Sequence, residues 1–136
     1  MTKPKPKLPS ERTPAAKIPM LRLATGREPF WRDIVPGVRV QFRPINVAAI
    51  LLARTAAADV LRAGGEDAMV KAGVAFTSSL AHSGIVAWEG VGDADGNPVE
   101  PTKETIDAAL ELWPVFDAID RLYVGPALIQ DAEKNV

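Results

Sequence analysis

The sequence predicts a mainly α-helical domain with a small N-terminal β-hairpin, which is an α+β fold of about four helices. Two short strand-like runs flank Pro36-Gly37, and long apolar stretches with helix start and stop signals follow. The length of 136 residues is that of one ordinary domain with a single core. We therefore expect a single domain over residues 21–136, preceded by an extended or disordered Pro/Lys arm over residues 1–20.

The β-hairpin is predicted over about residues 29–43. The run Phe30–Val35 and the run Val38–Arg43 are joined by the turn residues Pro36-Gly37, and the second run alternates apolar and polar residues as a half-buried strand does. Pro44 would end the second strand. Alternation places Val38, Val40 and Phe42 toward the core, and Arg39, Gln41 and Arg43 toward water.

Four helices are expected after the hairpin, over about residues 46–63, 66–88, 102–113 and 114–133. Asn46 is a suitable N-cap for the first, and Gly64-Gly65 a suitable stop. Thr102 would cap the third, and Pro114 would begin the fourth, which Gly125-Pro126 would interrupt. The apolar faces of the second, third and fourth predicted helices would contain, in that order, Met69, Gly73, Phe76, Leu80 and Ala87; Ile106, Ala109, Leu110 and Trp113; and Val115, Phe116, Ile119, Leu122 and Tyr123.

Two glycines fall inside the second predicted helix. Each lowers the helix propensity by about 1 kcal/mol relative to alanine. Glycine at such a site is typical of close helix packing, so we expect a neighbouring element to approach both Gly73 and Gly84.

Charge is distributed unevenly along the chain. Residues 1–43 carry ten Lys or Arg and three Asp or Glu, whereas residues 44–136 carry six and fourteen. The arm lysines are spaced by prolines with no aromatic residue between them, so we do not expect nucleic-acid binding. A solvated tail is the favoured interpretation. The alternative is that the arm docks on an acidic surface of this domain or of another copy.

No catalytic, cofactor-binding or metal-binding residues are predicted, and we do not expect an enzyme. The chain has no cysteine to act as a nucleophile, and its single histidine, His82, lies within a predicted helix. The carboxylates are scattered over predicted polar faces, where their ordinary pKa suits neither acid nor base catalysis at neutral pH. No apolar run reaches the roughly 18 to 20 residues of a membrane span, and no secretory signal is expected.

An acidic, glycine-containing turn follows Trp88, which we expect to anchor the end of the second helix in the core. Asp93, Asp95 and Asn97 alternate as the first ligands of a calcium-binding EF-hand loop do. The register does not fit, because with Asp93 as position one the obligatory glycine position is Pro98. We therefore expect a polar turn closed by its own Asp and Asn side chains.

In their order, these features resemble the tail assembly chaperones of long-tailed bacteriophages and prophages. The resemblance covers about residues 27–136, and its most specific part is the Trp-Glu-Gly-Val turn combined with a C-terminal Glu-Lys-Asn. The residues that carry it are Trp88, Glu89, Gly90, Val91, Asp93, Asp95, Gly96, Pro98, Trp113, Tyr123, Glu133, Lys134 and Asn135.

The resemblance implies a non-catalytic protein of the bacterial host cytoplasm. It would bind the tape measure protein, help to recruit tail-tube subunits, and be absent from the mature virion. In such families a frameshifted longer form contacts the tube protein, and this chain would be the shorter product. Self-association of the bipolar chain is a further expectation, through head-to-tail contacts that salt would weaken.

Two other functions remain open. The first is a structural virion protein, such as a head-tail connector or adaptor, whose basic arm docks on a neighbour. It would be present in purified particles, unlike a chaperone. The second is a small nucleic-acid-binding regulator, which a gel shift would detect.

Overall fold

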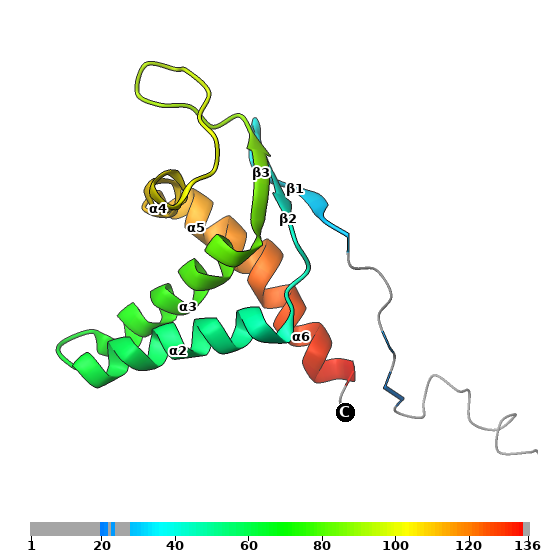
Figure 1. Cartoon of the computed structure of the whole chain (residues 1–136), viewed down its shortest axis with the longest axis vertical. Helices are drawn as coiled ribbons and strands as arrows, with labels where there is room; N and C mark the ends of the chain where they lie inside the picture. The colour runs from blue at the N-terminus through cyan, green and yellow to red at the C-terminus, as the bar shows by residue number, and fades with distance from the viewer. Residues whose placement is uncertain (1–19, 22, 24–27, 135–136) are drawn as a thin grey trace, which may run out of the picture.

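The computed structural model describes residues 20–21, 23 and 28–134, so the predicted arm lies outside the described residues except for Met20. The elements follow the chain in the order β1 (Phe30–Val35), β2 (Val38–Phe42), α2 (Val47–Ala63), α3 (Ala68–Gly84), β3 (Ile85–Glu89), α4 (Lys103–Leu110), α5 (Trp113–Ile119), the π-helical turn η2 (Asp120–Val124) and α6 (Gly125–Lys134) (Figure 1). The predicted α+β class, with a β-hairpin followed by helices, is confirmed.

The sheet has one strand more than the hairpin that the sequence predicts. It is antiparallel with the order β1-β2-β3, and Val40 pairs with both Arg32 and Trp88. The predicted helix 66–88 is wrong at its C-terminal end, because residues 85–89 form β3. Ile85 and Val86 are β-branched and follow a glycine, which favours a strand. A hairpin alone is marginally stable, and the added strand pairs the second edge of β2.

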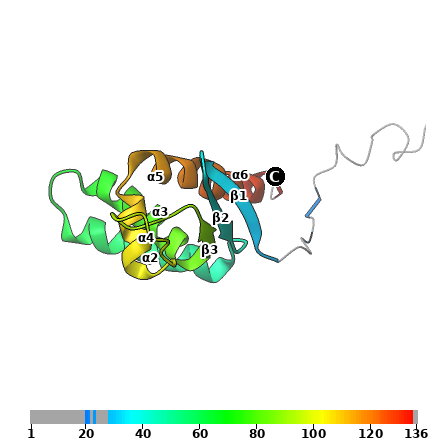
Figure 2. The same cartoon turned by 90° about the horizontal axis from the view of Figure 1, so that it is seen from above.

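Helices α2 and α3 form a hairpin with the predicted start and stop. The Asn46 side chain accepts a hydrogen bond from the Ala49 amide at 2.8 Å, and Gly64 ends α2 with a φ of 68°. The far end of this hairpin projects beyond the sheet (Figures 1 and 2). Within the described residues, no helix has the length and apolar character needed to cross a membrane.

The C-terminal helices begin as predicted, but the predicted interruption is wrong. Thr102 caps α4, accepting from the Thr105 amide, and Pro114 lies in the first turn of α5. Gly125-Pro126 does not break the helix, which runs on from Trp113 to Lys134 through η2. Pro126 has no amide hydrogen, and its ring would clash with the carbonyl four residues earlier in an α-helix. The wider π turn, in which the Gly125 amide donates to the Asp120 carbonyl, accommodates it.

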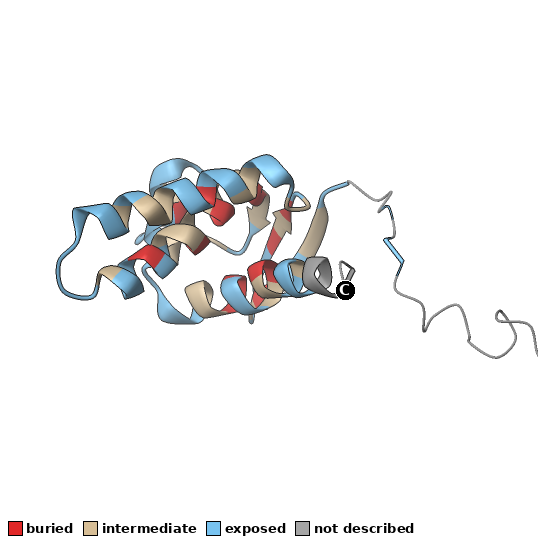
Figure 3. Cartoon of the chain, turned by 90° about the horizontal axis from the view of Figure 1, so that it is seen from below, coloured by how far each residue is buried: buried red, intermediate tan, exposed pale blue. Residues whose placement is uncertain are grey.

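The core lies where the sheet, α3 and the C-terminal helical run meet (Figure 3). Its largest fully buried side chains are those of Phe42, Leu80, Ile119 and Val40. Tyr123 stacks on Phe42 with ring centroids 4.0 Å apart, and its hydroxyl donates to the Arg43 carbonyl at 2.6 Å. These contacts join the C-terminal helices to the sheet.

Two large side chains predicted on apolar helical faces are exposed. Met69 lies on the projecting part of α3, beyond the reach of the sheet and α4. Trp113 is in the first turn of α5 instead of the third helix, where it stacks on Phe116 at the surface. Ala87, placed on the same predicted face as Met69, belongs to β3.

The two glycines of α3 differ in their surroundings. A methyl group at Gly84 would overlap the Tyr123 hydroxyl, so the close approach predicted there is confirmed. The same prediction for Gly73 is wrong. Apart from the adjoining residues and the backbone of α3 itself, no atom lies within 4 Å of a methyl group at that position.

Alanine substitutions at the two glycines should therefore have opposite effects on stability. Gly84→Ala is expected to lower the free energy of unfolding by about 2 to 3 kcal/mol, because buried overpacking displaces Tyr123. Gly73→Ala should raise it by about 0.5 to 1 kcal/mol through helix propensity. Urea denaturation of both variants measures the difference, and equal effects would contradict the packing of Tyr123 on Gly84.

The burial of Tyr123 is also expected to make the stability of the fold depend on pH. Burial raises the pKa of Tyr123 from 10.0 to about 12, an effect that the nearby Arg43 charge partly offsets. The neutral phenol is thus favoured in the folded protein, and its contribution to stability is present below pH 10 and is lost as the pH rises toward about 12. The chain has a single tyrosine, so phenolate absorbance reports it alone. We expect a native midpoint near 12 and a midpoint near 10 in denaturant; equal midpoints would contradict the burial.

Candidate functional site

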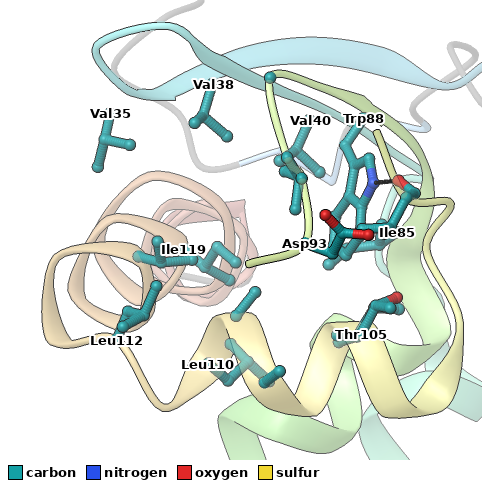
Figure 4. A pocket seen from close by; sticks show the side chains of 18 residues that line it. Val35, Val38, Val40, Ile85, Trp88, Asp93, Thr105, Leu110, Leu112 and Ile119 are labelled. Carbon is teal, nitrogen blue, oxygen red and sulfur yellow. Dashed lines mark hydrogen bonds between the residues drawn. The ribbon is translucent and has the colours of Figure 1, made fainter. Parts of the chain in front are cut away.

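An apolar cleft of about 500 Å³ lies between the sheet, the loop 90–99, α4 and α5 (Figure 4). Asp93, Thr105 and the Trp88 indole supply the polar side-chain groups of its lining. Apolar pockets of this size accommodate small ligands or the side chains of a partner. Its principal lining residues are Val35, Val38, Val40, Ile85, Trp88, Val91, Val99, Ile106, Ala108, Leu110, Leu112, Val115 and Ile119.

The loop 90–99 is fixed over the cleft by main-chain and indole hydrogen bonds. The Trp88 Nε1–H group donates to the Val99 carbonyl at 2.6 Å, and the Val99 amide donates to the Val91 carbonyl at 3.1 Å. Gly90 has a φ of 85°, and a methyl group there would overlap the Gly37 carbonyl. Trp88 is half-buried in β3, so its predicted role at a helix end is wrong. It positions the loop instead.

The predicted polar turn is confirmed at the tip of this loop. Asp93 Oδ1 accepts hydrogen bonds from the amides of Asp95 and Asn97, each at 2.9 Å, and Gly96 has a φ of 83°. Thr105, which also lines the cleft, donates its hydroxyl hydrogen to the Glu100 carbonyl at 2.7 Å. Polar groups of the lining thus already have partners within the protein. The cleft is therefore suited to an apolar occupant.

His82 pairs with a carboxylate of α4. Its Nε2 lies 2.6 Å from Asp107 Oδ1, so the ring is held between α3 and α4. No hydrogen bond within the described ranges joins His82 to a serine hydroxyl, although three serines lie within four residues of it. Among all the residues that the structure describes, no cluster of three or more His, Asp or Glu side chains is arranged to hold a metal ion.

A second candidate surface is the outer face of α2. Of the 17 residues of α2 only Ala53 is buried, and the helix packs mainly on α3. The spacing of 4, 3, 4 and 3 residues that follows Val47 is the heptad pattern by which a helix contacts another helix. We name this set the α2 stripe; its members are Val47, Leu51, Arg54, Ala58 and Leu61.

The structure separates the sequence-predicted signature into four places. Trp88 and Glu89 end β3, and the residues from Gly90 to Pro98 form the loop over the cleft. Trp113 begins α5 at the surface, and Tyr123 lies in the core. Glu133 and Lys134 end α6, and Asn135 lies outside the described residues.

Sequence reasoning missed the cleft, and for the first helix it left open whether an apolar face is core or meets a partner. The cleft combines residues from four separate segments, and no local pattern contains it. The α2 stripe has a readable signal in its heptad spacing. An apolar pattern on both sides of one helix, however, does not show which side is buried.

Comparison with known proteins does not assign the chain to a family, because no protein-family model, no curated protein sequence and no solved structure matches it.

Proposed function

We propose that this protein is a non-catalytic tail assembly chaperone that binds the tape measure protein of a long-tailed phage and promotes assembly of the tail tube. It acts in the cytoplasm of the bacterial host and leaves before the virion is complete. A frameshifted longer form would supply the contact with tail-tube protein. The observation that carries the proposal is the exposed apolar surface of α2, together with the signature residues around Trp88 that resemble this class of chaperone.

The α2 stripe supports a helical client. Val47, Leu51 and Leu61 are large and exposed, and they recur at the spacing that presents side chains along one side of a helix. An amphipathic client helix would cover them by helix-to-helix packing, which is a common form of peptide recognition. The apolar area removed from water in this way supplies the main binding free energy.

Arg54 gives this surface a chemical preference. It lies at the centre of the α2 stripe and makes no ion pair with the residues that the structure describes. A client with a glutamate or aspartate opposite Arg54 would satisfy its charge, whereas a lysine there would repel it. The expected client segment is therefore a heptad-patterned helix with an acidic residue among its apolar contacts.

The alternative function, that of a structural virion protein, predicts a different final location for the protein. A head-tail connector or adaptor would be present stoichiometrically in purified particles. A chaperone would be found only in the lysate of infected or induced cells. Immunoblotting of both fractions separates the two, and stoichiometric protein in the particles would contradict the chaperone proposal.

The test of the client surface is co-purification with the tape measure protein. Leu51→Asp places a carboxylate in the α2 stripe at a side chain that is 53% exposed, so the domain should still fold. We expect the amount of tape measure protein retained from co-expressing cells to fall at least about tenfold, as for the loss of an interface hot spot. Quantitative densitometry of the co-purified bands measures the effect.

Ile129→Asp is the matched control. Ile129 lies on α6, is 60% exposed, and is not part of the α2 stripe. This variant should retain the client as the unaltered protein does. Equal losses in the two variants would overturn the assignment to α2, and failure of the unaltered protein to retain the tape measure protein would overturn the proposed function.

A further inference from the structure

Three large apolar side chains before the sheet are exposed. Met20, Leu21 and Leu23 are between 60% and 83% exposed. A group of exposed apolar side chains is typical of a segment that contacts a partner surface. This short segment, Met20–Leu23, thus has the composition of a docking segment.

The charge around this segment is complementary to that around the apolar cleft. Residues 1–27, which contain Met20–Leu23, carry seven Lys or Arg and a single acidic residue, Glu11. Residues 89–111, which form the loop and α4 beside the cleft, carry seven Asp or Glu and a single basic residue, Lys103. All seven carboxylates are on exposed residues. Opposite charges of this size attract the two segments and orient the encounter.

The cleft also fits the segment in chemistry and in size. Its volume of about 500 Å³ is sufficient for several aliphatic side chains, and its lining is almost entirely apolar. Asp93, a residue of the acidic loop, lines the cleft (Figure 4). An apolar segment with basic neighbours therefore matches an apolar cleft with acidic surroundings.

The position of the arm favours a cleft on a second copy. The arm joins the sheet at Phe30, which pairs with Phe42. The cleft begins at the buried Ile85, the other partner of Phe42, and extends to Val35 and Val38 at the far end of the hairpin. The chain from Leu23 to Phe30 spans at most about 25 Å. Running back along β1 alone would use about 17 Å of that reach. Little chain would remain to pass the edge of the sheet and enter the cleft of the same molecule.

We propose that the Met20–Leu23 segment of one copy docks in the apolar cleft of the next copy. The contact joins two different surfaces, so each copy offers one free arm and one free cleft. Repetition of the contact gives head-to-tail chains. This proposal does not depend on the tail-assembly function, because it concerns only contacts between copies of this chain.

The experiment measures the mass of the full-length protein by sedimentation equilibrium over a range of concentrations. We expect the mean mass to rise with concentration beyond that of a dimer. Raising the salt from about 50 to about 500 mM should weaken the association at least about tenfold, because it screens the charges of arm and cleft. A monomeric mass at every concentration would overturn the proposal.

Two variants test whether the docking segment and the cleft are the two surfaces that form the contact. Leu21→Asp with Leu23→Asp alters the docking segment at exposed positions, and Ala108→Arg places a cation at an exposed position of the cleft lining. Each variant alone should be monomeric, with an unchanged thermal melt. An equimolar mixture should form a one-to-one dimer and nothing larger, because one intact cleft then meets one intact arm. Association of either variant alone, or no dimer in the mixture, would overturn the proposal.

Discussion

The phenol ring of Tyr123 stacks on Phe42, and its hydroxyl donates to the carbonyl of Arg43. The amide of Arg43 in turn donates to the carbonyl of Gly84 at 2.8 Å, and Gly84 is the residue over which the tyrosine hydroxyl lies. One side chain therefore connects the end of β2, the junction between α3 and β3, and the C-terminal helical run. Because this junction holds β3 against β2 and the helices against the sheet, the cleft and the loop above it depend on it.

The sequence signals were sufficient wherever the structure is locally determined. The strands of the hairpin, the Asn46 and Thr102 caps, the Gly64 stop and the Asp93 turn were predicted from residue types, because each is stabilised by contacts within a few residues. The errors occur mainly where distant contacts decide. Residues 85–89 form a strand since β2 offers them an edge. The error at Pro126 has a local cause instead, because a π turn makes room for the proline ring. The apolar cleft is assembled from four separate segments, so it has no signature in the sequence.

The two candidate surfaces have different chemistry and lie on different elements. The α2 stripe is a convex helical surface with a central arginine, which suits an amphipathic helix. The apolar cleft is concave, with acidic surroundings, and suits a short apolar segment between basic residues. A protein with both could form chains through the cleft while the α2 stripe of each copy remains available. Such an arrangement would cover an extended helical client with repeated copies of one small domain.

The central claim is that α2 is the surface that meets the client. Hydrogen-deuterium exchange of the protein alone and in complex with the tape measure protein tests it most directly. The backbone amides of Leu51–Leu61 should exchange more slowly in the complex, because a packed partner helix suppresses local opening of α2. The amides of α6 should be unchanged. Protection confined to α6, or no change in α2 on binding, would contradict the account.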